Sequence, residues 1–240
     1  MVRKLLRMLA VLCGTAAVLA VLLLFLAYRA MQQAPAFYQQ ALSERPEAEQ
    51  QVAGNQLEQE LLQLSNNVQE EGVWEARFTE DELNGWLAID LPEKFSKAIP
   101  AGISDPRVAI EPELLRVACH YKDQRMNSII SVALTARLTD EPNVLAIHVE
   151  QARAGWLPLP FKKVLEQITQ AALDAGISLE WTEQEGETVA LVTIPQQHDS
   201  YRFSVIHLDA VELRKGELYV AGRTEAKAAD QSESDVGLPK

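Results

Sequence analysis

The chain has 240 residues and a mass of 26.7 kDa, enough for one ordinary domain with appendages. Its residues are 48% hydrophobic and 23% charged, which excludes both a wholly disordered chain and a protein with several membrane spans. The net charge is −12. Because nucleic acids are bound mainly through clustered Lys and Arg, we expect no nucleic-acid partner.

The N-terminal region predicts a single transmembrane helix. Residues 8–28 carry no charge, lie between Arg7 and Arg29, and as a helix reach about 30 Å, the thickness of one hydrocarbon core. Three basic residues precede this span and only Arg29 follows closely, so the positive-inside rule keeps residues 1–7 in the cytoplasm. The remainder would then be extracytoplasmic, or periplasmic if the envelope has two membranes, and held at the cell membrane by an uncleaved signal anchor.

A cleaved signal peptide is the alternative, because a basic start and an apolar stretch are common to both. The apolar stretch of a signal peptide is shorter, however, and the small residues Ala34 and Ala36 lie well beyond it. Cys119 is the only cysteine outside the span, so no intramolecular disulfide can form there. Its alternation with Leu115, Val117 and Tyr121 predicts a buried structural thiol.

The exported part is strongly acidic and begins with a predicted helix. Beyond residue 29, 18 Lys and Arg stand against 34 Asp and Glu, a net charge of −16. After a linker over residues 32–40, a helix is expected from about Pro46 to Asn67, with Ser43 as a possible cap. Its apolar stripe packs on its own domain or associates with a second copy or an envelope protein through residues 46–68. A plain spacer is the remaining interpretation. The stripe consists of Leu57, Leu61, Leu64 and Val68.

A short strand and a capped helix are predicted next. Trp74, Ala76 and Phe78 alternate with polar residues, as in a strand with one buried face. Thr79 and Glu82 then have the spacing of a capping box, in which each side chain satisfies a backbone amide of the other residue. The apolar stripe of this helix would be Leu83, Trp86 and Leu87.

The middle of the chain predicts an antiparallel sheet. Pro, Asp and Asn turns separate four strand candidates, and loops this short force neighbouring strands to run antiparallel. The candidates are Arg107 to Glu111, Leu114 to Lys122, Asn127 to Leu138 and Val144 to Ala152. We expect a dry face formed by Leu115, Val117, Cys119, Tyr121, Ile130, Val132, Leu134, Ala136, Leu138, Leu145, Ile147 and Val149. The opposite, wet face would carry Arg116, His120, Ser131, Thr135, Arg137 and His148.

An apolar loop with two prolines, residues 155–161, precedes a predicted amphipathic helix that ends near Gly176 and covers the dry face. Three further strands are expected, Thr188 to Ile194, Arg202 to Ala210 and Glu217 to Gly222. Beyond Arg223 the chain reads as a disordered tail. The predicted division is therefore 1–7, an anchor over 8–28, a linker and acidic helix over 29–72, an α+β domain over 73–223, and a tail over 224–240.

Two motifs carry a resemblance to a known family. Residues 78–84, Phe-Thr-Glu-Asp-Glu-Leu-Asn, follow a short strand, and Gly-Trp-Leu-Pro-Leu-Pro at 155–160 opens a helix, all behind an N-terminal anchor. Over roughly residues 73–175 this pattern resembles the YpmS-like family of membrane-anchored extracytoplasmic proteins. It is more distantly similar to tubular lipid-binding domains. The second resemblance implies a curved antiparallel sheet that wraps one long helix and leaves an apolar groove.

Two functions are expected as alternatives. In the first, the space between sheet and helix binds a lipid or another hydrophobic envelope molecule, with the ligand groove formed by Trp156, Leu157, Leu159, Phe161, Val164, Leu165 and Ile168. In the second, these residues only close the core, and the chain is an anchored interaction or structural module.

We expect no enzyme, because no Gly-x-Ser-x-Gly elbow or Gly-rich phosphate loop is present. We also expect no cofactor and no metal, since His120, His148, His198 and His207 lack the spacing of a metal motif.

Overall fold

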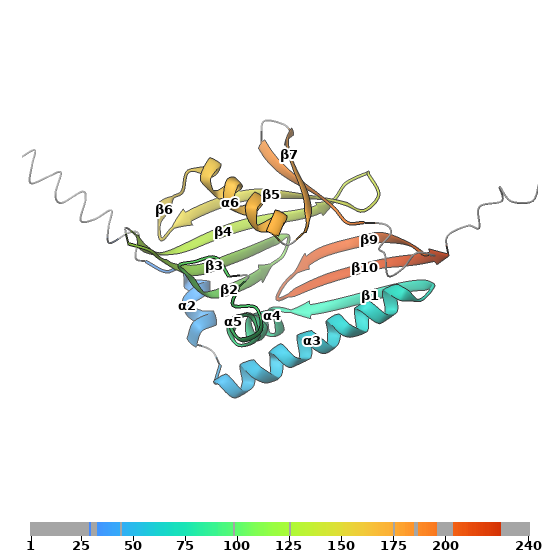
Figure 1. The fold of residues 1–240 in the computed structure, drawn as a ribbon, viewed down its shortest axis with the longest axis horizontal. Helices are drawn as coiled ribbons and strands as arrows, with labels where there is room; N and C mark the ends of the chain where they lie inside the picture. Colours follow the sequence, from blue (N-terminus) through green and yellow to red (C-terminus); the bar gives the residue numbers. More distant parts are fainter. Residues whose placement is uncertain are drawn as a thin grey trace, which may run out of the picture.

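The computed structural model describes Arg29 and residues 33–43, 45–97, 99–124, 126–174, 176–184, 187–195 and 204–226. The fold is α+β, and its strands form two antiparallel sheets (Figure 1). One sheet has three strands in the order β1-β10-β9, and the other has the order β2-β3-β4-β5-β8-β7, with β6 added to β5. Among the residues described, no helix is long and apolar enough to cross a membrane. The predicted span 8–28 lies outside these residues.

The segment expected to be a linker contains a helix, α2 (Ala36–Ser43), which packs against β2 (Ile103–Glu111). Tyr38 fixes this contact, because its ring is 1% exposed and its hydroxyl donates to the Asp105 carbonyl at 3.0 Å. Ser43 therefore ends α2 and does not cap the next helix, as the sequence had suggested.

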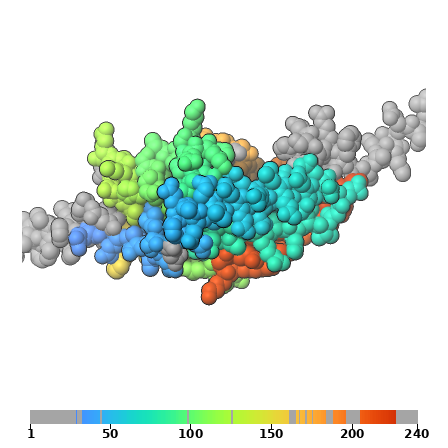
Figure 2. All heavy atoms as spheres, turned by 90° about the horizontal axis from the view of Figure 1, so that it is seen from below, coloured from blue at the N-terminus to red at the C-terminus, as the bar shows by residue number. Residues whose placement is uncertain are grey.

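The acidic helix is confirmed as α3 (Glu47–Gln69), with Pro46 directly before its first turn. It packs on its own domain, against α4 (Glu80–Ala88) and β1 (Gly72–Thr79). Leu57 forms a core cluster with Ala76 and Phe78, and Leu64 packs against it. Leu61, expected in the same stripe, is exposed. Figure 2 shows α3 lying along the surface of the molecule.

The capping box is confirmed at the start of α4. The amide of Glu82 donates to Thr79 Oγ1 at 3.2 Å, and the Thr79 amide donates to Glu82 Oε2 at 2.8 Å. A short helix, α5 (Asp90–Lys94), follows. The α3–α4 crossing is close, since a Cβ added to Gly85 would lie 2.4 Å from the Gln50 carbonyl oxygen.

The four central strand predictions are confirmed with small changes at their ends. The structure has β2, β3 (Leu114–Lys122), β4 (Asn127–Leu138) and β5 (Val144–Ala154), each antiparallel to the next. Polar side chains of α4 cover the free edge of β2. The Asn84 amide both donates to the Val108 carbonyl and accepts from its N–H, and Glu80 accepts from the Ile110 amide. This edge is therefore closed to further strand pairing.

The proline-rich loop folds back on β5. Its two-residue strand β6 (Leu157–Pro158) pairs with Ala154 and Arg153, after a turn in which Gly155 has a φ of 57°. The predicted helix follows as α6 (Phe161–Asp174), and Gly176 after it has a φ of 70°. The next strand, β7 (Ser178–Gln184), was not predicted, although Leu179 and Trp181 alternate with polar residues. It pairs with β8 (Glu187–Thr193), whose other neighbour is β5.

The last two strands form the second sheet together with β1, in the order β1-β10-β9, and do not join the central sheet. They are β9 (Ser204–Arg214) and β10 (Glu217–Ala226), and both extend beyond the predicted ends at Ala210 and Gly222. Asn143 joins the two sheets. Its amide donates to the Ile206 carbonyl and accepts from the Leu208 amide, each at 2.8 Å.

The expected single sheet wrapped around one long helix differs from this arrangement in two respects. The strands divide into two sheets, because β10 pairs with β1 far away in the sequence, from Thr79 opposite Glu217 to Gly72 opposite Thr224. The longest described helix, α3, packs beside the three-stranded sheet and α4, while α6 contacts the central sheet at β7.

Candidate functional site

One face of the central sheet is apolar over three neighbouring strands. The register aligns β3, β4 and β5 so that residues directly opposite one another project to the same side. The resulting rows are Leu115–Leu134–Val149, Val117–Val132–Ala152 and Cys119–Ile130–Ala154. The members from β3 and β4 belong to the dry face that the sequence predicts. We call these six residues, Leu115, Val117, Cys119, Ile130, Val132 and Leu134, the apolar patch.

Burial of this face differs between the three aligned strands. In the three rows, the β5 members Val149, Ala152 and Ala154 are buried, whereas every member of the apolar patch on β3 and β4 is only half-buried. Leu145 and Ile147, further along the same face of β5, are half-buried as well. An apolar side chain that remains partly in water forgoes part of the roughly 25 cal/mol per Å² that burial contributes. The cover over the apolar patch is therefore incomplete among the described residues.

The amphipathic helix α6 lies over the β7 end of this same face. The Trp181 indole nitrogen donates to Thr169 Oγ1 of α6 at 2.7 Å. The register places Trp181 opposite Ala190, and Ala190 opposite Ile147, so Trp181 shares the face of the apolar patch. The predicted cover of the dry face therefore lies towards the β7 side of the sheet.

The residues of the predicted ligand groove occupy several positions around this face. Leu157 and Leu159 are half-buried beside β5, where the Leu159 amide donates to the Ala152 carbonyl at 2.9 Å. Leu165 and Ile168 of α6 are also half-buried. Trp156 is 65% exposed. The side chains of Phe161 and Val164 lie outside the described ones, although both residues belong to α6.

Cys119 is the thiol of the apolar patch. It is half-buried, and desolvation raises the pKa of its thiol above the usual value. A raised pKa reduces the thiolate fraction at neutral pH, and the thiolate is the reactive form. The thiol is half-buried and not buried as the sequence predicts, so its reactivity can report on access to the patch.

The opposite, polar face holds a cavity of about 110 Å³. Trp156 and Gly155 lie at it, and Pro35 and Phe37 come from the segment around the start of α2. The register places Arg116, Ala133 and Gln151 in one row of this face, and Ser131 and Arg153 in the next. The sequence placed Arg116 and Ser131 on the wet face correctly. It did not indicate that Phe37, Gln151 and Arg153 join them.

The histidines do not form a metal centre in the described part of the chain. His120 and His148 share the polar face, but His120 is opposite Ile129 whereas His148 is opposite Thr135, six residues further along β4. His120 instead contacts Asn127 Oδ1 at 2.6 Å and Ser104 Oγ at 3.3 Å. No group of three or more His, Cys, Asp or Glu with metal-binding geometry occurs among the described residues.

Comparisons with known proteins identify no relative. No family model matches the chain, and neither the curated proteins nor the solved structures give a significant match.

Proposed function

We propose that this protein is an anchored extracytoplasmic domain that binds a hydrophobic molecule of the cell envelope, such as a lipid acyl chain, on the apolar patch. The observation that supports this most is the incomplete burial of the apolar patch next to the buried β5 residues Val149, Ala152 and Ala154. Six contiguous apolar side chains on two central strands are left half in water, on the same sheet face that α6 covers further along, at β7. A hydrocarbon ligand would gain binding free energy on this surface from the apolar area that both remove from water.

The anchor and the resemblance support the same proposal. The span over residues 8–28 would hold the domain beside a membrane, where acyl chains are available. The similarity to tubular lipid-binding domains implies an apolar groove between sheet and helix. In this chain the corresponding space would lie between α6 and the central sheet, with Leu157, Leu165 and Ile168 at its margin.

Cys119 provides a direct test, since a ligand on the apolar patch would cover its thiol. The full chain with Cys13→Ser, in a neutral detergent, is treated with N-ethylmaleimide at rising concentrations of a dansyl-labelled fatty acid. We expect the alkylation rate of Cys119 to fall saturably, by about fivefold or more, with the same midpoint as the dansyl fluorescence. An unchanged rate at saturating fatty acid would contradict the proposal.

A matched control separates a local effect from a detergent effect. Leu62 is 66% exposed on α3, so Leu62→Cys in a background without Cys13 and Cys119 places a thiol on a distant helix surface. Its alkylation rate should not respond to the fatty acid. Parallel slowing at both thiols would also count against binding at the patch.

A second function is favoured by the outer surface of α3. Val52, Leu61 and Leu62 are exposed there, which suits an envelope protein partner at residues 46–68. Crosslinking in intact membranes tests this, with the wild-type chain compared with a Val52→Lys, Leu62→Lys variant. A specific crosslinked band should disappear in the variant, and an identical band pattern would remove this alternative.

A further inference from the structure

The cavity on the polar face concentrates positive charge in an acidic chain. Arg116 and Arg153 both line it, and none of its lining residues is Asp or Glu. The other polar lining groups are the hydroxyl of Ser131 and the amide of Gln151. In a chain with a net charge of −12, two guanidinium groups line one cavity that has no lining carboxylate, although Glu111 outside it forms an ion pair with Arg116. This arrangement forms a local site for an anion.

The two arginines differ in how they are held. Glu111 accepts from Arg116 Nε at 2.9 Å and from Nη2 at 3.3 Å, which fixes the plane of that guanidinium and leaves its Nη1 hydrogens available. No described residue forms an ion pair or side-chain hydrogen bond with Arg153. Arg137, on the same face, is by contrast 3.8 Å from Glu113. Arg153 is therefore the cation of this face that an external anion can engage.

The remaining walls are apolar and indicate what the anion is attached to. Trp156, Phe37 and Pro35 border the cavity, and the Trp156 side chain is 65% exposed. A bare inorganic anion gains little binding free energy from an aromatic surface, whereas the carbon skeleton of an ester can pack against it. Guanidinium groups bind phosphate oxygens through paired, charge-assisted hydrogen bonds.

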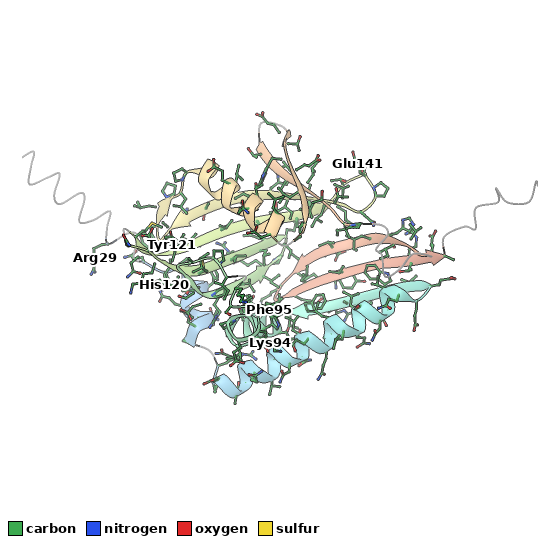
Figure 3. All side chains as sticks on the ribbon, viewed as in Figure 1. Arg29, Lys94, Phe95, His120, Tyr121 and Glu141 are labelled. Carbon is green, nitrogen blue, oxygen red and sulfur yellow. The ribbon has the colours of Figure 1, made fainter. Side chains whose placement is uncertain are left out.

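The cavity lies at the end of the molecule where the chain enters from its N-terminal side. Figure 3 places Arg29 at the same end as His120 and Tyr121, near the end of β3. The register brings Ala154 beside Ile130, and Ile130 beside Cys119, so the turn with Trp156 lies at this end too.

We propose that this cavity binds a phosphate ester, with its phosphate between Arg116 and Arg153 and its organic part against Trp156 and Phe37. The ester is either the headgroup of a membrane phospholipid or a soluble metabolite of the same chemistry. Apart from Val132, which belongs to the apolar patch and also lines this cavity, the sheet residues of the site are on the opposite face from the patch, so the site does not rest on the function proposed above.

Isothermal titration calorimetry on the full chain in a neutral detergent tests the proposal with three probes. These are dihexanoyl phosphatidylglycerol, glycerol 3-phosphate and inorganic phosphate. We expect at least one ester to bind about tenfold or more tightly than inorganic phosphate, and Arg153→Gln to weaken that ester by about tenfold or more. Arg153→Lys keeps the charge but not the paired hydrogen bonds, so its affinity for the ester should lie between those of wild type and Arg153→Gln.

Arg137→Gln is the matched control, because it removes one positive charge from the same face outside the cavity. It should leave ester binding unchanged. Tighter binding of the phosphatidylglycerol identifies a lipid headgroup, and equal binding of both esters identifies a soluble ester. Absence of ester binding, equal affinity for inorganic phosphate, or equal losses in Arg137→Gln and Arg153→Gln would overturn the proposal.

Discussion

Asn143 shows how one side chain holds two sheets together. It is buried, has a φ of 60°, and its amide replaces a missing strand partner for both Ile206 and Leu208 of β9. A positive φ costs most residues roughly 1 kcal/mol but is tolerated by Asn, so the backbone and the side chain favour the same residue here. The sequence identified this position only as part of a turn.

Replacement of Asn143 should therefore destabilise the domain strongly. We expect Asn143→Ala to lower the free energy of unfolding by about 2 to 4 kcal/mol, because two partly buried backbone groups lose their partners and the backbone is strained. Asn143→Gly should cost about 1 kcal/mol less, since only the strain is relieved. Urea unfolding followed by circular dichroism measures both. Glu141→Ala, at an exposed position of the same turn, is the control. If Asn143→Ala costs no more than Glu141→Ala, the proposed role of Asn143 is refuted.

Tyr38 should make stability depend on pH in the alkaline range. Burial, followed by the nearby Asp105 carboxylate, raises the pKa of its phenol from 10.0 to about 12. The folded protein thus favours the protonated phenol, whose contribution is complete below pH 10 and is lost as the pH rises towards 12. Tyr38→Phe removes the hydrogen bond to Asp105 and should cost about 1 kcal/mol at pH 7.

The difference in unfolding free energy between wild type and Tyr38→Phe isolates this titration from other groups. We expect wild type to be the more stable at pH 7 and to lose this advantage by about 1 to 2 kcal/mol between pH 10 and 12. Tyr121→Phe serves as a comparison, because a hydrogen bond to Asp123 also raises the pKa of Tyr121, but at an exposed position, so its pH-dependent loss should be smaller. A difference for Tyr38 that is constant with pH would show that its phenol titrates normally in the folded state.

At the scale of whole elements, the α3–α4 crossing depends on the absence of side chains. A Cβ at Gly85 would lie 2.4 Å from the Gln50 carbonyl oxygen and 2.9 Å from Ala53 Cβ. Helix propensity alone predicts that Gly85→Ala stabilises by about 1 kcal/mol, whereas overpacking costs about 1 to 3 kcal/mol or more. We expect the steric term to win, because Gln50 contributes rigid backbone.

Thermal unfolding of Gly85→Ala decides between these two effects by its sign. A decrease in Tm is expected, together with greater access of protease to α3. Asn66→Ala, on the exposed surface of α3, is the control and should leave Tm nearly unchanged or slightly raised. A raised Tm in Gly85→Ala would mean that the two helices are not tightly packed.

Elements with a strong local signal were predictable from the sequence. The bounds of β3 and β4 and the capping box of α4 follow from alternation, turn residues and the spacing of Thr79 and Glu82. The division into two sheets was not, because pairing of β1 with β10 leaves no trace in local periodicity. The candidate sites divide in the same way. The apolar patch follows from alternation within strands, whereas the cavity joins Phe37 to Arg153 across more than a hundred residues.

At the scale of the whole molecule, the predicted anchor and the described fold imply one orientation. Arg29 and the cavity with Trp156 are at one end, while β1 begins at the other (Figure 1, Figure 3). A helix that leaves the membrane near residue 28 would bring the Arg29 end to the bilayer surface. Exposed Trp side chains are favoured at the membrane interface. The two arginines of the cavity would offset part of the repulsion between anionic lipid and the part of the chain beyond residue 29, whose net charge is −16.

This orientation predicts which tryptophan contacts lipid. The full chain is reconstituted into vesicles that contain brominated phosphatidylcholine, which quenches nearby indoles, and its fluorescence is compared with that in unbrominated vesicles. We expect a quenched component that disappears in Trp156→Phe. It should persist in Trp74→Phe, because Trp74 is buried near the start of β1 and donates to Thr224. Equal quenching in wild type and Trp156→Phe would place another surface at the membrane, and the phosphate-ester cavity would then face the aqueous phase.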